Sequence, residues 1–141
     1  MNKFMMLAIK EAEKGIRAGH GGPFGSVIVK DGKIIAKGHN RVIANNDPTC
    51  HGEIDAIRRA CKKLKTWHLD DCTLYSTMEP CVMCSGAIIQ SRIKKIVYSI
   101  SNNSFGNIEN NEYLQKNKYE IVKIDNKEML ELVQKFFKKL R

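Results

Sequence analysis

Two short motifs constrain the fold of this chain more than any other feature. One reads H-G-E at residues 51–53, and the other reads P-C-V-M-C at residues 80–84. Together they supply one imidazole, two thiols and one further carboxylate, and an imidazole with two thiolates is a common ligand set for zinc. Because the motifs lie far apart in the sequence, the fold must bring them together. Three protein ligands leave the fourth position of the metal open, which is typical of a catalytic site.

The residues of these motifs predict hydrolytic chemistry. His51, Cys81 and Cys84 are the expected ligands of Zn²⁺, which lowers the pKa of a water in the fourth position toward about 7. Glu53 is not needed as a ligand, so its carboxylate is expected to carry protons between that water and a substrate. Glu79 is expected to orient the site without taking part in the chemistry.

The order of the predicted elements indicates a mixed sheet that helices cover on both faces. A hairpin turn is expected at residues 31–32 (Asp-Gly), and strands and helices alternate after it. The hydrophobic pattern predicts helices over 4–18, 48–64, 80–91 and 127–140, and strands over 24–29, 33–37, 72–77, 95–100 and 119–124. Both motifs fall at helix starts, where the positive end of the helix lowers the pKa of thiols.

The length and hydropathy of the chain predict one domain spanning residues 1–141, because a chain of 141 residues can bury a substantial core. Its hydrophobic content of 43% is normal for a globular protein. No apolar run approaches the ~20 residues of a membrane span, and residues 1–4 lack the features of a signal peptide. We therefore expect a cytoplasmic protein with no membrane partner.

The net charge of +9 could favour an RNA partner. The basic residues, however, are spread almost evenly along the chain, which favours a solvated surface over a dedicated binding face. Charge alone does not decide the substrate.

The remaining cysteines and two histidines are expected to have no chemical role. Cys50, Cys61 and Cys72 are interpreted as small buried hydrophobic residues. Cys50 is the one that could act as a stray ligand, because it precedes the histidine of the first motif. His20 and His68 are predicted to lie in surface loops.

The combination H-x-E with P-C-x-x-C is the signature of zinc-dependent nucleobase deaminases. On these motifs the chain resembles the cytidine deaminase superfamily, in the branch of cytosine, guanine and tRNA adenosine deaminases. The resemblance covers almost the whole chain and implies a three-layer α/β/α cytidine deaminase-like fold with a mixed five-stranded sheet. It also implies that Zn²⁺ is the cofactor, that ammonia is released by hydrolysis, and that the protein is a homodimer or a larger assembly.

The resemblance further implies which residues contact the base. Asn40 stands where the family places an asparagine that hydrogen-bonds the base, whereas His39 is expected to pack or to face solvent. Phe24 lies in a G-P-F-G stretch similar to that of bacterial guanine deaminase, and Gly52 makes the motif similar to that of fungal-type cytosine deaminase. Phe105 falls near a phenylalanine that closes over a small base in the cytosine enzyme.

Three hypotheses follow for the function. The first is a deaminase of a free nucleobase, with cytosine placed before guanine. The second is a tRNA-specific adenosine deaminase, which would need a basic rim for RNA phosphates, for example from residues 58–59 (Arg-Arg) and the basic C-terminal helix. The third is a zinc-stabilised binding module, which would need a fourth ligand from Cys50, Cys61, Cys72 or His68 and would leave Glu53 without a role.

Overall fold

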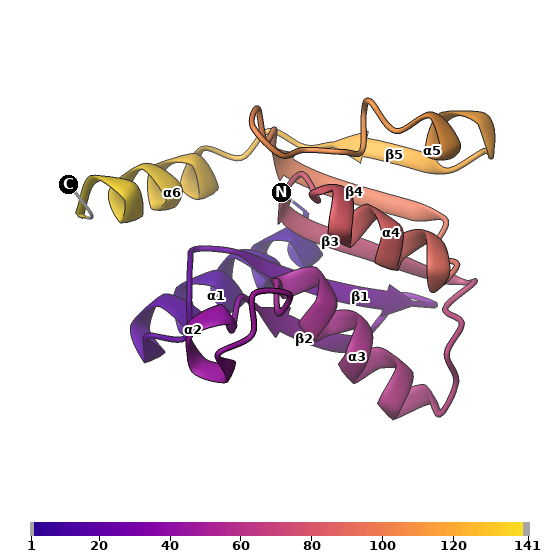
Figure 1. The fold of residues 1–141 in the computed structure, drawn as a ribbon, viewed down its shortest axis with the longest axis horizontal. Helices are drawn as coiled ribbons and strands as arrows, with labels where there is room; N and C mark the ends of the chain where they lie inside the picture. The colour runs from indigo at the N-terminus through magenta and orange to yellow at the C-terminus, as the bar shows by residue number, and fades with distance from the viewer. Residues whose placement is uncertain (1, 140–141) are drawn as a thin grey trace.

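The computed structural model describes residues 2–139, apart from the side chain of residue 137. The described residues form one five-stranded sheet, in the order β2-β1-β3-β4-β5 (Figure 1). The strands are β1 (Gly25–Lys30), β2 (Lys33–His39), β3 (Cys72–Met78), β4 (Lys95–Ile100) and β5 (Glu120–Lys123). Strand β1 is antiparallel to β2 and β3, and β3, β4 and β5 run parallel. The predicted α/β class and mixed sheet are confirmed.

The β1–β2 hairpin turns where the sequence predicts it. Asp31 and Gly32 both have positive φ angles, of 51° and 74°, which match the right-handed twist of the flanking strands. This hairpin makes β2 an edge strand, with β1 as its one neighbour in the described sheet.

Four longer helices cover the two faces of the sheet. Helices α1 (Lys3–Ala18) and α6 (Lys127–Lys139) pack on one face, and α3 (Gly52–Leu64) and α4 (Val82–Gln90) pack on the other. The predicted three layers are therefore present. Helix α6 extends past the end of the sheet (Figure 1). Leu140, the last residue predicted for this helix, lies outside the described residues.

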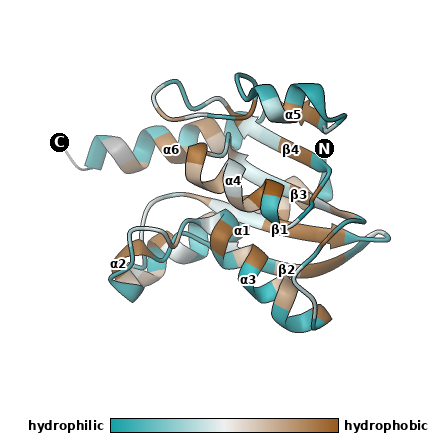
Figure 2. Cartoon of the chain, turned by 45° about the vertical axis from the view of Figure 1, so that its right-hand side comes forward, coloured by the Kyte–Doolittle hydropathy of each residue, from teal (hydrophilic) through white to brown (hydrophobic). Residues whose placement is uncertain are grey.

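Alternate residues of each strand contribute to two separate cores. In β1, Val27 and Val29 pack with α1, and Ile28 between them packs with α3 and α4. Figure 2 shows hydrophobic residues along the strands and mostly hydrophilic loops. None of the described helices has the length and apolar character needed to cross a membrane.

Two short helices were not predicted, namely α2 (Val42–Asn45) and α5 (Glu112–Lys116). Each is five residues or shorter, so neither shows the hydrophobic repeat on which the helix prediction depends. The helix predicted from residue 48 begins at Gly52, and the helix predicted from residue 80 begins at Val82.

Candidate active site

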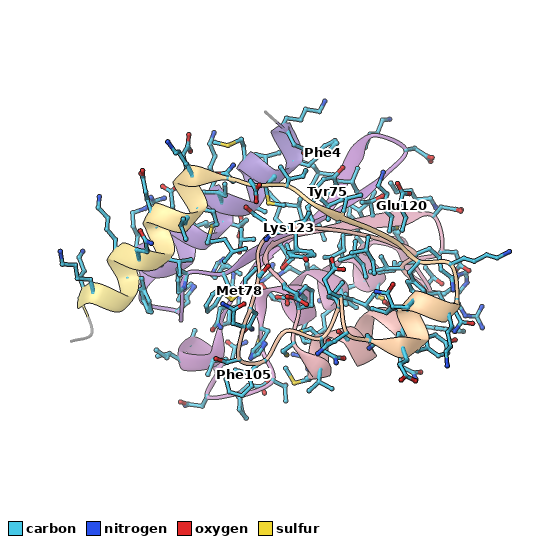
Figure 3. All side chains as sticks on the ribbon, turned by 90° about the horizontal axis from the view of Figure 1, so that it is seen from above. Phe4, Tyr75, Met78, Phe105, Glu120 and Lys123 are labelled. Atoms are coloured by element: carbon cyan, nitrogen blue, oxygen red, sulfur yellow. The ribbon has the colours of Figure 1, made fainter. Side chains whose placement is uncertain are left out.

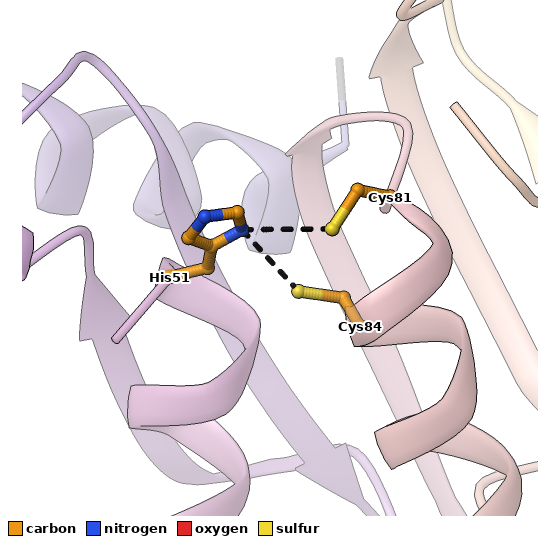
Figure 4. A group of neighbouring side chains, drawn as sticks. All are labelled: His51, Cys81 and Cys84. Carbon is orange, nitrogen blue, oxygen red and sulfur yellow. Dashed lines mark hydrogen bonds between the residues drawn. The ribbon is translucent and has the colours of Figure 1, made fainter. Parts of the chain in front are cut away.

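The two motifs meet where α3 and α4 begin. His51 and Cys81 are the N-cap residues of these helices and have extended backbones, and Cys84 lies in the first turn of α4. The Nδ1 atom of His51 lies 3.7 Å from Sγ of Cys81 and 3.6 Å from Sγ of Cys84 (Figure 4). Tetrahedral zinc with ordinary bond lengths requires a nitrogen–sulfur separation of about 3.6 Å. The three side chains are therefore arranged as a metal site of this kind demands.

The three groups share their protons through hydrogen bonds. The pKa of Cys81 is lowered to about 3, chiefly because the Cys84 thiol donates a hydrogen bond to its sulfur. The same hydrogen bond and burial raise the pKa of Cys84. The pKa of His51 is raised by its hydrogen bond with Cys81. One sulfur thus carries negative charge beside the imidazole, and a metal ion would replace the shared protons.

Among the described residues, no fourth protein ligand joins these three side chains. In residues 2–139, His51, Cys81 and Cys84 form the one group of three or more His, Cys, Asp or Glu side chains spaced for a metal ion. Cys50 is buried and its sulfur accepts a hydrogen bond from the side chain of Asn45 at 3.5 Å. The open fourth position argues against the hypothesis of a zinc-stabilised module.

Glu53 lies in the first turn of α3 and lines the same cavity as His51 and Cys81. Its side chain is buried, with 6% of the residue exposed, and this burial raises the pKa of its carboxyl group. A carboxyl group that takes up protons more readily than usual suits the proton-transfer role predicted for it.

A cavity of about 690 Å³ opens in front of these residues. Its walls are largely apolar, and among the described residues that line it none is a lysine or an arginine. Of the residues predicted to contact the base, Phe24, Asn40 and Phe105 line this cavity. Figure 3 shows Phe105 at the outer edge of the molecule and Met78 further in, and 74% of Phe105 is exposed.

Gly52 is not among the residues that line the cavity. It is buried at the start of α3, where an added Cβ atom would lie 3.3 Å from the carbonyl oxygen of Phe24. Its position serves close packing of α3 against β1, and a contact between Gly52 and the base stays a prediction.

His39 packs inside the protein, which is the first of the two positions predicted for it. Its ring is fully buried, with Nδ1 lying 2.9 Å from a carboxylate oxygen of Glu11 and Nε2 lying 2.8 Å from Nδ1 of His20. His20 lies in a loop, as predicted, and its ring stacks on that of His39 and is partly buried. The sequence pattern could not show this, because the three residues come from α1, β2 and the loop between α1 and β1.

The loop over residues 101–111, from which Phe105 was predicted to contact the base, forms one wall of the cavity. Glu79 anchors it: its carboxylate accepts hydrogen bonds from the backbone N–H groups of Asn102, Ile108 and Glu109, at 3.3, 3.1 and 3.3 Å. The N–H group of Asn107 donates to the carbonyl oxygen of Pro80 at 2.9 Å. The loop is thus joined directly to the segment that carries Cys81.

This wall adds cavity residues that were missed from the sequence, namely Asn102 and Ser104, and Ser76 joins them from β3. The sequence offered one signal for this wall, namely Glu79, the charged residue directly before the P-C pair. A buried carboxylate must accept hydrogen bonds, and the backbone N–H groups of a nearby loop can donate them. The expectation that Glu79 orients the site agrees with its contacts.

Comparison with known proteins gives a consistent set of similarities. The sequence matches the family described as MafB19-like deaminase over residues 1–141. It is 55% identical over 96 residues to the guanine deaminase of Bacillus subtilis, a match that spans 68% of this chain and 62% of the relative. It is 41% identical over 145 aligned positions to the tRNA-specific adenosine deaminase of Aquifex aeolicus, which spans 98% of this chain and 94% of that protein.

A solved structure agrees with the sequence matches. The guanine deaminase of Nitrosomonas europaea superposes with a TM-score of 0.85 at 25% identity, and the match covers 94% of this chain and 82% of that chain. The fold therefore has counterparts among proteins that are named as deaminases.

Proposed function

Since the chain belongs to the MafB19-like deaminase family and is thus a hydrolase of C–N bonds, we propose that it is a zinc-dependent deaminase of a free nucleobase. The observation that carries this proposal is the cavity in which Glu53 and the cluster of His51, Cys81 and Cys84 meet. That arrangement combines a metal site with an open position and a buried carboxyl group beside it.

The composition of the cavity wall supports an uncharged substrate. A nucleotide or an RNA segment would bring phosphate groups, and these need lysine or arginine side chains nearby. The described lining residues include the carboxylates Glu53 and Glu79 and no basic side chain, so a phosphate here would lack a partner. A free base carries no phosphate and suits largely apolar walls with a few polar groups.

In the proposed mechanism, His51, Cys81 and Cys84 would hold a zinc ion, which would make a water acidic enough for hydrolysis at neutral pH. Glu53 would accept a proton from the attacking water and deliver it to the ring nitrogen next to the carbon that bears the amino group. The water oxygen adds to that carbon, and Glu53 then passes the second proton to the amino group. Ammonia leaves and a carbonyl oxygen remains on the base, so that one water is consumed for each ammonia released.

The side chains around the base hold it for this transfer. The Oδ1 atom of Asn40 accepts a hydrogen bond from the N–H group of Val42 at 3.0 Å, which fixes the orientation of the side-chain amide. The amide is then placed to hydrogen-bond the edge of the base. Phe24 and Phe105 offer aromatic faces on the cavity wall.

Guanine is the base that we propose first. Two of the similar proteins are named guanine deaminases, and a cavity of about 690 Å³ has room for a purine. Cytosine, which the sequence placed before guanine, remains the second base within the same class.

The alternative is a tRNA-specific adenosine deaminase. It is favoured by the similarity to the Aquifex aeolicus protein, which extends over 98% of this chain. The net charge of +9 agrees with it, although the basic side chains do not line the cavity.

Ammonia release by the zinc-loaded protein distinguishes these functions. Guanine, cytosine, adenine, cytidine and a tRNA anticodon stem-loop are supplied in parallel at equal concentrations, with the Glu53→Gln variant as the control for contaminating activity. Turnover of guanine or cytosine supports the proposal. Inosine formed in the stem-loop, without turnover of any free base, overturns it in favour of the alternative.

A further inference from the structure

A second cavity, of about 330 Å³, lies at the edge strand β2 and differs in character from the first. Helices α1 and α3, which cover opposite faces of the sheet, both reach this edge (Figure 1). Basic side chains from α1, β2, the segment after β2 and α3 line it, namely Lys14, Lys37, Arg41, Arg59 and Lys63. We call this the basic cavity.

The positive charges of the basic cavity are only partly balanced by the protein, although Glu11 also lines it. Its two nearby acids are already engaged, since Glu11 contacts His39 at 2.9 Å and Asp55 contacts both arginines. Within the described part of the chain, no carboxylate lies within ion-pair distance of Lys14, Lys37 or Lys63. Gathering three unpaired lysines beside two arginines that share one carboxylate costs free energy, and a bound anion would lower that cost.

The two arginines are held in place for such an anion. Asp55 has a side chain only 9% exposed, and its two oxygens accept separate hydrogen bonds from Nε of Arg41 and Nε of Arg59, each at 3.0 Å. In the described structure, the terminal nitrogens of both guanidinium groups have no acceptor. A guanidinium with a fixed orientation and free terminal N–H groups matches the geometry of a phosphate.

We propose that the basic cavity binds a phosphate group. This site is separate from the cavity that contains Glu53 and the metal-ligand cluster, which we call the deamination cavity. The two cavities share no lining residue, although Asn40 lines one and its neighbour Arg41 lines the other. The phosphate can belong to a free nucleotide or to the backbone of an RNA, because both present the same group to the five cations. The proposal depends on the charges and contacts of this edge, not on the base that the protein deaminates.

The test is titration calorimetry of the zinc-loaded full chain, at low salt, with inorganic phosphate, guanosine monophosphate and a short single-stranded RNA. The variant is the double change Lys14→Gln with Lys63→Gln. The matched control is Lys10→Gln with Lys62→Gln, which removes the same charge from exposed positions on the same two helices outside the cavity. The first variant is expected to bind phosphate ligands about tenfold more weakly, and the control less than about twofold.

The outcomes separate the two phosphate sources. Binding of inorganic phosphate and guanosine monophosphate that only the cavity variant weakens supports a small phosphorylated ligand. Binding of RNA alone, weakened in the same selective way, supports an RNA backbone. No binding of any of the three, or equal weakening in both variants, overturns the proposal. Base deamination is measured in parallel, so that a failure of the proposed function is recognised independently.

Discussion

The deamination cavity and the basic cavity adjoin in sequence at Asn40 and Arg41, yet they are built in opposite ways. The first has apolar walls, carboxylates and a metal-ligand cluster, and no basic residue is found among its described lining residues. The second is lined by five basic residues, together with one acid, Glu11, and two apolar residues. Consecutive residues at the end of an extended strand can serve different sides of a sheet, so one strand end contributes to both. This fold thus places a cavity without basic side chains and a strongly basic cavity on either side of a single peptide bond.

The two cavities also differ in how strongly a single substitution is expected to change activity or ligand binding. Glu53, Cys84 and Glu79 are buried and hydrogen-bonded to specific partners. Lys14, Lys37 and Lys63 are exposed, and in the proposed phosphate site they would act through their summed charge. Large effects are therefore expected from changes in the deamination cavity, and small ones from changes in the basic cavity.

The largest effect is expected from Glu53→Gln, which keeps the shape of the side chain and removes its ability to carry a proton. Turnover of the base should fall by about 10²- to 10⁴-fold. The zinc content, measured by mass spectrometry, should stay unchanged, because Glu53 is not needed as a ligand. Activity close to that of the unchanged protein would show that another group transfers the proton.

A smaller effect is expected from Asn40→Ala, which removes the polar group predicted to hold the base. The specificity constant kcat/KM should fall by about 10- to 100-fold, because a buried hydrogen bond to the base is lost. Phosphate binding at the basic cavity should change little. A large parallel loss of phosphate affinity would show that the two cavities are not independent.

A third test compares Gly106→Ala with Gly86→Ala. An added Cβ at Gly106 would lie 2.6 Å from Oε1 of Glu79, whereas nothing lies within 4 Å of a Cβ added at Gly86. The first change should displace the loop over residues 101–111 and raise KM for the base by about tenfold, the equivalent of about 1.4 kcal/mol.

The second change should leave KM unchanged and raise the free energy of unfolding by about 0.5–1 kcal/mol, since alanine is favoured over glycine in a helix. Steady-state kinetics and chemical denaturation check these results. Equal KM values for the two variants would mean that the loop does not contribute to substrate binding.

The smallest effect is expected from salt on deamination. Raising the salt concentration from about 50 to 200 mM should change kcat/KM for a free base by less than about twofold, because no phosphate contact is involved. A steep loss of deamination with salt would indicate an RNA substrate and would favour the alternative function.

Much of this fold could be predicted because its longer elements carry strong local signals. The hydrophobic repeat of α1, α3 and α6 and the Asp31-Gly32 turn are properties of short segments, and the structure contains all of them. Helices α2 and α5 could not be predicted in this way, since each is too short to show a repeat. The boundaries at Gly52 and Val82 were set by the extended N-cap residues His51 and Cys81, whose backbones the motif pattern does not reveal.

By itself, the sequence determined the residues of the metal-ligand cluster and the predicted role of Glu53, because the ligand chemistry of zinc depends on residue type and spacing. Only the tertiary structure decided what surrounds them. Glu79 finds its donors in a loop that follows β4, His39 is buried between Glu11 and His20, and the basic cavity gathers residues from α1, β2 and α3. Contacts between segments far apart in the chain leave no local pattern, since packing of the helices on the sheet alone brings them within hydrogen-bond or Coulomb distance.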